Sequence, residues 1–87
     1  MINEPLVSII LVNYNGAVHT LECVKSLDNV NYSNFEIIIV DNASKQEDVE
    51  ILRNLKSNKR VKLIESSENT GFSGGNNIGL RAVSYTH

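Results

Sequence analysis

The sequence FEIIIVDNAS occupies residues 35–44. Apart from Glu36, residues 35–40 are apolar, and the last four of them are β-branched. A continuous apolar run of this kind is typical of a strand buried on both faces, as in a parallel sheet covered by helices. Asp41 follows the run directly, at the strand end where open α/β sheets place their ligands. Asp41 is therefore the first candidate for a binding residue.

Strands and helices are predicted to alternate along the rest of the chain. Apolar runs alternate with segments of helical apolar spacing, and short polar turns separate them. The predicted strands are 6–12, 35–40 and 61–64, the predicted helices are 17–27, 45–55 and 78–83, and a polar loop is predicted over 65–77. Ser44 and Glu47 have the spacing of a capping box for the helix at 45–55. This order predicts an α/β fold, a parallel β-α-β-α-β-α three-layer unit with right-handed crossovers.

The composition excludes several classes of protein. A chain of 87 residues is one small domain or part of a larger one, and its formal net charge of −2 gives no electrostatic basis for binding nucleic acid. The single cysteine, Cys23, has no second thiol for a disulfide, and its apolar neighbours predict a buried thiol. The apolar run at 6–12 is too short for a membrane span and lacks a preceding basic segment. We therefore expect a cytoplasmic protein, with the cytoplasmic face of a membrane as the alternative.

Polar clusters follow the three predicted strands, at 13–15, 41–42 and 69–77. Because the carboxyl ends of parallel strands lie on one edge, the clusters should converge on one crevice. Tyr14 offers a ring to stack on a base, or it packs over the edge of the sheet. Asp41 suits a ribose hydroxyl or the N–H of a base, or it caps the turn that follows. Asn42 is expected to shape this turn rather than to contact a ligand.

The segment 71–79 contains four glycines. Glycines here allow positive φ or a close approach to a ligand, and the predicted helix after them favours an anion at its N-terminus. The alternative is a long loop with a glycine-rich entry into a helix. Phe72 is expected to anchor this loop to the core. The chain has no Gly-x-Gly-x-x-Gly after its first strand and no P-loop motif, which argues against a Rossmann dinucleotide site and excludes a P-loop.

Taken together, these segments resemble the N-terminal half of the family 2 glycosyltransferases. The motifs that carry the resemblance are VSIILVNYN at 7–15, FEIIIVDNAS at 35–44 and NTGFSGGNNIG at 69–79. The variants NYN and GFSGGNN are similar to those of the rhamnosyltransferase-like branch. The resemblance implies a GT-A fold, of which residues 1–87 would form the N-terminal, nucleotide-sugar-binding part.

The resemblance also implies an activity. Such enzymes transfer a sugar from a nucleoside diphosphate donor, of UDP, dTDP or GDP type, to a hydroxyl of a saccharide or lipid-linked acceptor in polysaccharide biosynthesis. They usually require Mg²⁺ or Mn²⁺. The nucleotide-binding residues carried over by position are Val12, Asn13, Tyr14, Asp41, Asn69, Gly71, Gly75 and Asn76. The first three would line the base pocket, Asp41 would bond the base or the ribose, and the others would shape the donor side.

The family's Asp-x-Asp metal motif and its general base fall after the matched segments, so no residue here receives a catalytic or metal-binding role. We expect a part of a longer protein, truncated before the metal motif and inactive alone. In the family's fold the first strand pairs with a later strand. Without that partner, residues 9–12 form an open apolar edge, which predicts a homodimer or aggregation.

Two other classes of protein remain open. One is a non-catalytic α/β nucleotide-binding or interaction module with a flavodoxin-like or receiver-like fold. A receiver requires an acidic pair after its first strand, where this chain has Asn13 and Asn15. The other is a nucleotidyltransferase, which requires a glycine-rich basic loop that the NYNG sequence at 13–16 does not provide.

Overall fold

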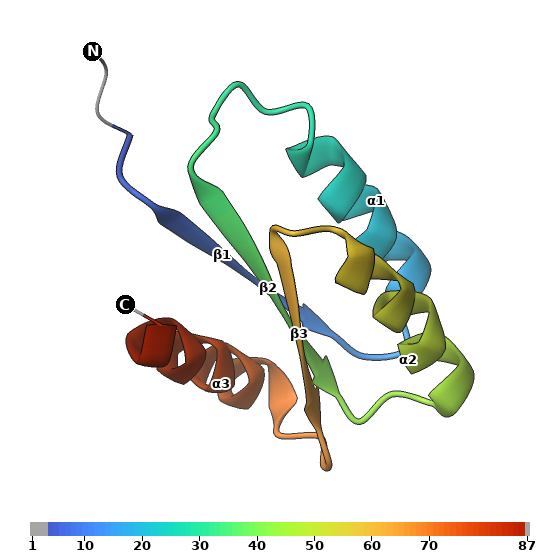
Figure 1. Cartoon of the computed structure of the whole chain (residues 1–87). Helices are drawn as coiled ribbons and strands as arrows, with labels where there is room; N and C mark the ends of the chain where they lie inside the picture. Colours follow the sequence, from blue (N-terminus) through green and yellow to red (C-terminus); the bar gives the residue numbers. More distant parts are fainter. Residues whose placement is uncertain (1–3, 87) are drawn as a thin grey trace.

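The chain forms a three-stranded parallel sheet with helices on both faces (Figure 1). The computed structural model describes residues 4–86, with side chains up to residue 83. Its elements are β1 (Val7–Asn13), α1 (Ala17–Leu27), β2 (Phe35–Asn42), α2 (Gln46–Arg53), the 3₁₀ turn η1 (Asn54–Ser57), β3 (Val61–Ser66) and α3 (Gly71–Thr86). The strand order is β1-β2-β3. The predicted alternating α/β architecture is confirmed, and each strand extends one or two residues beyond the predicted carboxyl end.

The central strand, β2, is buried over its whole length. Ile37, Ile38, Ile39 and Val40 are all fully inaccessible to solvent. Successive side chains of a strand point to opposite faces. Ile37 and Ile39 belong to the core cluster that also contains residues of α1 and α2, so α1 and α2 cover that face. The other face lies under α3, which explains why the run 37–40 is continuously apolar.

Helix α3 begins at Gly71, seven residues before the predicted start, and the prediction of a polar loop is wrong over residues 71–77. The physical reason is close packing against β1. A Cβ on Gly75 would lie 2.7 Å from Val12 Cγ1, and a Cβ on Gly79 would lie 2.6 Å from Ile10 Cγ2. Two glycines one helical turn apart therefore allow α3 to approach the strand more closely than a helix with side chains there.

Three local predictions about side chains are wrong. Phe72 does not anchor a loop to the core, because its side chain is 75% exposed in the first turn of α3. Cys23 is exposed, since the buried stripe of α1 consists of Ala17, Thr20 and Val24 and passes beside it. The capping box is absent, because Lys45 occupies the N-cap of α2 and makes no side-chain capping bond. The hydroxyl of Ser44 donates instead to Asp41 Oδ1.

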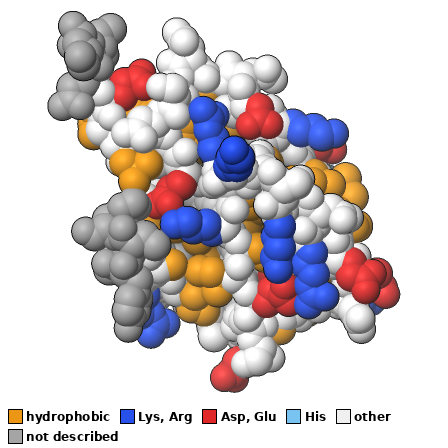
Figure 2. Space-filling view, viewed as in Figure 1, with side chains coloured by type: hydrophobic (Ala, Val, Ile, Leu, Met, Phe, Trp, Pro, Cys, Tyr) orange, Lys and Arg blue, Asp and Glu red, His pale blue; other side chains and the backbone are white. Residues whose placement is uncertain are grey.

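Charged side chains of both signs are interspersed over the face drawn in Figure 2. This distribution agrees with the small net charge. Within residues 4–86, no helix has the length and apolarity that a membrane crossing requires.

Candidate functional site

Parallel pairing brings the polar residues at the strand ends together. Asn13 is paired with Asp41 across β1 and β2, and Asp41 is paired with Glu65 across β2 and β3. Asn13 and Asp41 are 2% and 1% exposed. Asp41 lies two residues after Ile39 on β2, so its side chain points to the face covered by α1 and α2. Asn13 is the partner of Asp41 in the pairing of β1 with β2, so its side chain points to the same face. The predicted convergence of the first two clusters is confirmed.

The amide of Asn13 is the centre of a buried polar network. Its Nδ2 donates to Asp41 Oδ1 at 3.0 Å and to Asp48 Oδ2 at 3.0 Å, with a longer contact of 3.3 Å to Ser44 Oγ. Its Oδ1 accepts from Thr20 Oγ1 at 2.6 Å. No buried side-chain nitrogen or oxygen in the described part of the chain is left without a partner. Burial of these groups is tolerated because each is hydrogen-bonded.

Asp41 closes the turn that follows β2. Its Oδ2 accepts from the Ser44 amide at 3.1 Å, and its Oδ1 accepts from Ser44 Oγ at 2.6 Å in addition to Asn13 Nδ2. Within this turn Ala43 has a φ of +61°, in the left-handed region. The expectation that Asp41 caps the turn is confirmed. A ligand role for Asp41 stays a prediction, and a ligand group that bonds to it has to fit beside or replace these three bonds.

The loop between β1 and α1 presents Tyr14, whose side chain is 56% exposed. The loop is fixed by the following residue, Asn15, which has a φ of +50°. The Asn15 amide donates to Ser44 Oγ at 2.8 Å, and its Oδ1 accepts from the Lys45 amide at 2.8 Å. The aromatic ring is thus carried on a loop tied to the start of α2.

The third cluster is organised by Asn42, which lies on the opposite face of the sheet from Asp41. Asn42 Nδ2 donates to the Gly71 carbonyl at 2.8 Å, and its Oδ1 accepts from the Thr70 amide and hydroxyl. It therefore holds the start of α3 against β2, a long-range contact that no local sequence pattern indicates. Asn69 Oδ1 accepts from the Gly71 amide at 2.8 Å, and Gly71 has a φ of +75°.

The remaining two predicted residues lie within α3. Gly75 is buried against Val12 and Asn42, and Asn76 Nδ2 donates to the Phe72 carbonyl at 3.1 Å. Gly75 and Asn76 thus belong to the helix on the face of Val12 and Asn42, opposite the face of Asn13 and Asp41. Their contacts to a ligand stay predictions.

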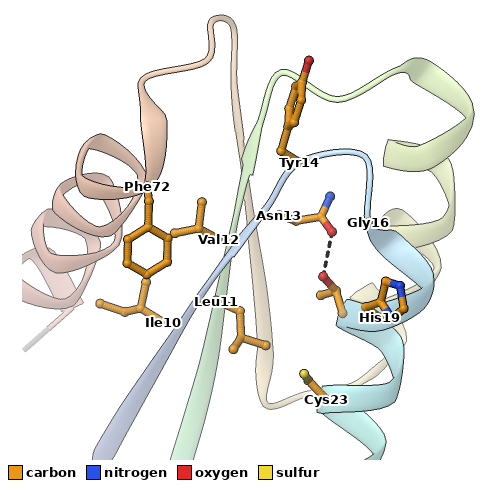
Figure 3. Close-up of a pocket in the computed structure, with 10 residues that line it drawn as sticks. Ile10, Leu11, Val12, Asn13, Tyr14, Gly16, His19, Cys23 and Phe72 are labelled. Atoms are coloured by element: carbon orange, nitrogen blue, oxygen red, sulfur yellow. Dashed lines mark hydrogen bonds between the residues drawn. The ribbon is translucent and has the colours of Figure 1, made fainter.

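A surface groove of about 470 Å³ runs along β1 from Ile10 to Tyr14 and reaches the carboxyl end of this strand (Figure 3). Of the predicted residues, Val12, Asn13 and Tyr14 line it. The other lining residues were not among the predicted ones: His19, Thr20 and Cys23, together with Ile10, Leu11, Gly16 and Phe72. The first three lie on α1, and they were missed because which side of α1 faces the edge of the sheet depends on tertiary packing. A pocket of this volume is in the range that accommodates small molecules.

A second groove, of about 360 Å³, borders the turn after β2 and includes Asp41 in its lining. Arg53 and Glu65 also line it and form a two-bond ion pair, with Nε to Oε2 at 2.9 Å and Nη2 to Oε1 at 2.6 Å. The hydrogen bond from Arg53 lowers the pKa of Glu65, and the same bond raises the pKa of Arg53. The cation of Arg53 is therefore already matched by a carboxylate.

The residues at this edge do not fit a metal centre. No group of three or more His, Cys, Asp and Glu side chains able to hold a metal ion occurs in residues 4–86. The two nearest carboxylates, Asp41 and Asp48, both accept hydrogen bonds from the amide of Asn13. In this structure both carboxylates therefore act as hydrogen-bond acceptors for Asn13.

The fold and the polar strand ends agree with what sequence comparison finds. The model of the family described as "Glycosyl transferase family 2" matches residues 8–86, so the chain belongs to this family. It is 38% identical over 79 residues to an uncharacterized glycosyltransferase of Haemophilus influenzae. This match covers 90% of this chain and 32% of the Haemophilus protein. It is 39% identical over 74 residues to a low-salt glycan biosynthesis hexosyltransferase of Haloferax volcanii, covering 85% and 22%.

A solved structure confirms the fold. A mannosyltransferase from Pyrobaculum calidifontis, solved in complex with GDP-Man and Mn²⁺, superimposes with a TM-score of 0.81 at 25% identity. The match covers 92% of this chain and 25% of the mannosyltransferase. The three-stranded unit therefore corresponds to a part of a GT-A glycosyltransferase. The chain spans between a fifth and a third of the length of these relatives.

Proposed function

We propose that this chain is the donor-nucleotide part of a family 2 glycosyltransferase, which transfers a hexose or a rhamnose from a nucleoside diphosphate sugar to an acceptor hydroxyl. The observation that carries the proposal is the exposed Tyr14 above a groove at the carboxyl edge of the sheet, in a chain of this family. The GDP-Man complex of the Pyrobaculum mannosyltransferase and the hexosyltransferase relative support a nucleotide-sugar donor. The NYN and GFSGGNN motifs support the rhamnosyl alternative.

The chemistry is divided between this part and the rest of the enzyme. Because the carboxylates here are hydrogen-bonded to Asn13, we assign no metal ligand to this chain. The proposal assigns Mg²⁺ or Mn²⁺, and the general base that deprotonates the acceptor, to residues outside these 87. The chain alone is then inactive and contributes nucleotide binding. The proposal includes a cytoplasmic location, with a saccharide or lipid-linked acceptor reached at the cytoplasmic face of the membrane.

Nucleotide titration tests the proposal. UDP, dTDP and GDP are added to isotope-labelled chain with and without Mn²⁺, and backbone amide shifts are followed. We expect shifts at 13–16, 41–42 and 69–77 for one nucleotide. Replacing Tyr14→Ala should weaken binding about fivefold or more, because stacking on a base is worth about 1–3 kcal/mol. Tyr14→Phe keeps the ring and should retain most of the affinity.

The outcome of the titration is decisive. A well-dispersed spectrum that responds to none of the three nucleotides contradicts nucleotide binding by this chain. Equal affinities for Tyr14→Ala and the original chain would show that the ring does not contact the base.

We also infer that two copies of the 87-residue chain associate through β1. Within the described residues, β1 pairs only with β2. The Val7 amide bonds to the Asn34 carbonyl, so the alternation of a parallel strand directs the backbone groups of Ser8, Ile10 and Val12 away from β2. Val30, which is 50% exposed, lines a separate apolar groove between this edge and α1. An open apolar edge of this kind favours pairing with another strand.

Sedimentation velocity over a range of concentrations tests the association. In the backbone, Ser8→Pro removes an N–H that points away from β2, and it should yield a monomer. Ser8→Ala is the matched control, because both variants lose the hydrogen bond from Ser8 Oγ to Glu36 Oε2 at 2.6 Å. A clean monomer of the original chain at high concentration would contradict the inference.

A further inference from the structure

The first turns of α1 and α2 are capped by residues from outside each helix. Gly16 occupies the N-cap of α1 and has no side chain to cap with. The Ala17 amide, the first of α1, donates instead to Asp48 Oδ1 at 3.0 Å. In the same way, the Lys45 amide at the N-cap of α2 donates to Asn15 Oδ1. A carboxylate at the start of a helix is stabilised by both the free amide groups and the helix dipole.

Asp48 makes two contacts with the loop that carries Tyr14, one at each end. Its Oδ1 holds Ala17, just after the loop, and its Oδ2 accepts from Asn13 Nδ2 at 3.0 Å, just before the loop. Asp48 lies 31 and 35 residues further along the chain from these partners. Its carboxylate therefore bridges the two ends of residues 14–16.

Without these hydrogen bonds, little would fix the conformation of residues 14–16. Tyr14 and Asn15 are exposed, and Asn15 has a positive φ, a conformation that persists only where the surroundings fix it. The Asn15 contacts to Ser44 and Lys45 hold the middle of the loop, and the Asp48 contacts hold its ends. These anchors fix the backbone that carries the Tyr14 side chain.

We propose that Asp48 is a positioning residue for nucleotide recognition: by bridging Asn13 and Ala17 it holds the loop in the conformation that presents Tyr14 to the base. This inference rests on the proposed function of the groove. Asp48 itself does not touch the ligand. Its effect on affinity comes from the fraction of molecules whose loop is in the binding-competent conformation.

Two variants separate the contacts of Asp48. Asp48→Ala removes both bonds. Asp48→Asn keeps an oxygen that can accept from the Ala17 amide but places an NH₂ group against Asn13 Nδ2, so it breaks only that bond. Glu47→Gln is the matched control, because it removes the same charge from the same turn of α2 at an exposed side chain. Val61→Ala, in β3 and far from the loop, controls for a general loss of stability.

The experiment measures hydrogen exchange of the Ala17 amide without ligand, and the nucleotide Kd from amide shifts. For Asp48→Ala we expect exchange at Ala17 to accelerate about tenfold relative to amides of β2. If the competent fraction falls to about a tenth, the Kd rises about tenfold. Asp48→Asn should raise the Kd while protecting Ala17. Glu47→Gln and Val61→Ala should change neither the Kd nor the exchange of Ala17 relative to β2.

Each possible result has one meaning. Faster exchange at Ala17 with an unchanged Kd makes Asp48 purely structural and overturns the proposal. Unchanged exchange and unchanged Kd show that the bridge does not hold the loop, and they overturn it as well. An equal rise in Kd for Val61→Ala attributes the effect to stability. If the unsubstituted chain binds no nucleotide, the proposed function fails and the positioning role with it, whereas exchange at Ala17 still reports whether the bridge exists.

Discussion

Replacing Gly75→Ala should destabilise the chain, although alanine is the better helix former. A Cβ at this position would lie 2.7 Å from Val12 Cγ1 and 3.0 Å from Val12 Cγ2. Because valine is restricted at χ1, it cannot turn away, and α3 has to shift from the sheet. Overpacking costs about 1–3 kcal/mol, and the gain from Gly to Ala in a helix is about 0.5–1 kcal/mol. The expected net loss in the free energy of unfolding is about 1 kcal/mol.

Urea unfolding followed by circular dichroism measures this loss, since the free energy falls linearly with denaturant. Asn77→Ala, at an exposed position of the same helix, is the control for helix propensity and should be neutral or stabilising. Val12→Ala removes the two methyl groups that collide, so the double variant should recover at least about 0.5 kcal/mol relative to additivity.

Unfolding of Gly75→Ala at a higher urea concentration than the original chain would contradict the close contact between Gly75 and Val12. Additivity of the two substitutions would likewise show that Gly75 and Val12 are not in contact. Either result would leave the glycine without a packing role and would make ligand contact its remaining explanation.

Two further predictions concern the turn after β2 and the ion pair beside it. Ala43→Gly should raise the free energy of unfolding by up to about 1 kcal/mol, because Ala43 has a φ of +61° that costs an L-residue about 1–2 kcal/mol; urea unfolding measures the gain, and a loss would contradict it. Arg53 lowers the pKa of Glu65, so the pair stabilises the fold above the ordinary pKa of glutamate, and this contribution disappears as the pH falls through the lowered value. Arg53→Gln should remove that part of the pH dependence of the free energy of unfolding, and the control Arg81→Gln should not. Parallel curves of stability against pH for the original chain and Arg53→Gln would show that the ion pair does not contribute to it.

The fold was predictable because its strongest signals are local. The apolar run at 37–40 requires cover on both faces, and this requirement alone indicates a parallel sheet between helices. Helix α3 was predicted to start too late, because a segment with four glycines and two adjacent asparagines has low helix propensity. The glycines serve tertiary packing, which a propensity argument does not contain.

The candidate site was predictable in place but not in detail. Strand ends in a parallel sheet share an edge, so the convergence of Asn13 with Asp41 followed from topology. The bridge made by Asp48 did not follow, because its partners are 31 and 35 residues away and depend on how α1 and α2 pack. The exposure of Cys23 was mispredicted for the same reason. Cys23 is exposed and its neighbour Val24 is buried, so a shift of one position around α1 decides the burial of a side chain.

The two buried polar residues at the end of β2, Asp41 and Asn42, stabilise the structure on opposite faces of the sheet. On the face of α1 and α2, the carboxylate of Asp41 already accepts three hydrogen bonds, and on the opposite face Asn42 is occupied with the start of α3. Both are 2% exposed or less, so a ligand group that bonds to either side chain has to fit beside these hydrogen bonds or replace them. Tyr14, by contrast, is exposed on a loop that the contacts of Asn15 with Ser44 and Lys45 hold in place. Substituting Asp41 should therefore weaken binding through the order of the turn and the loop, whereas substituting Tyr14 should weaken it with the loop intact.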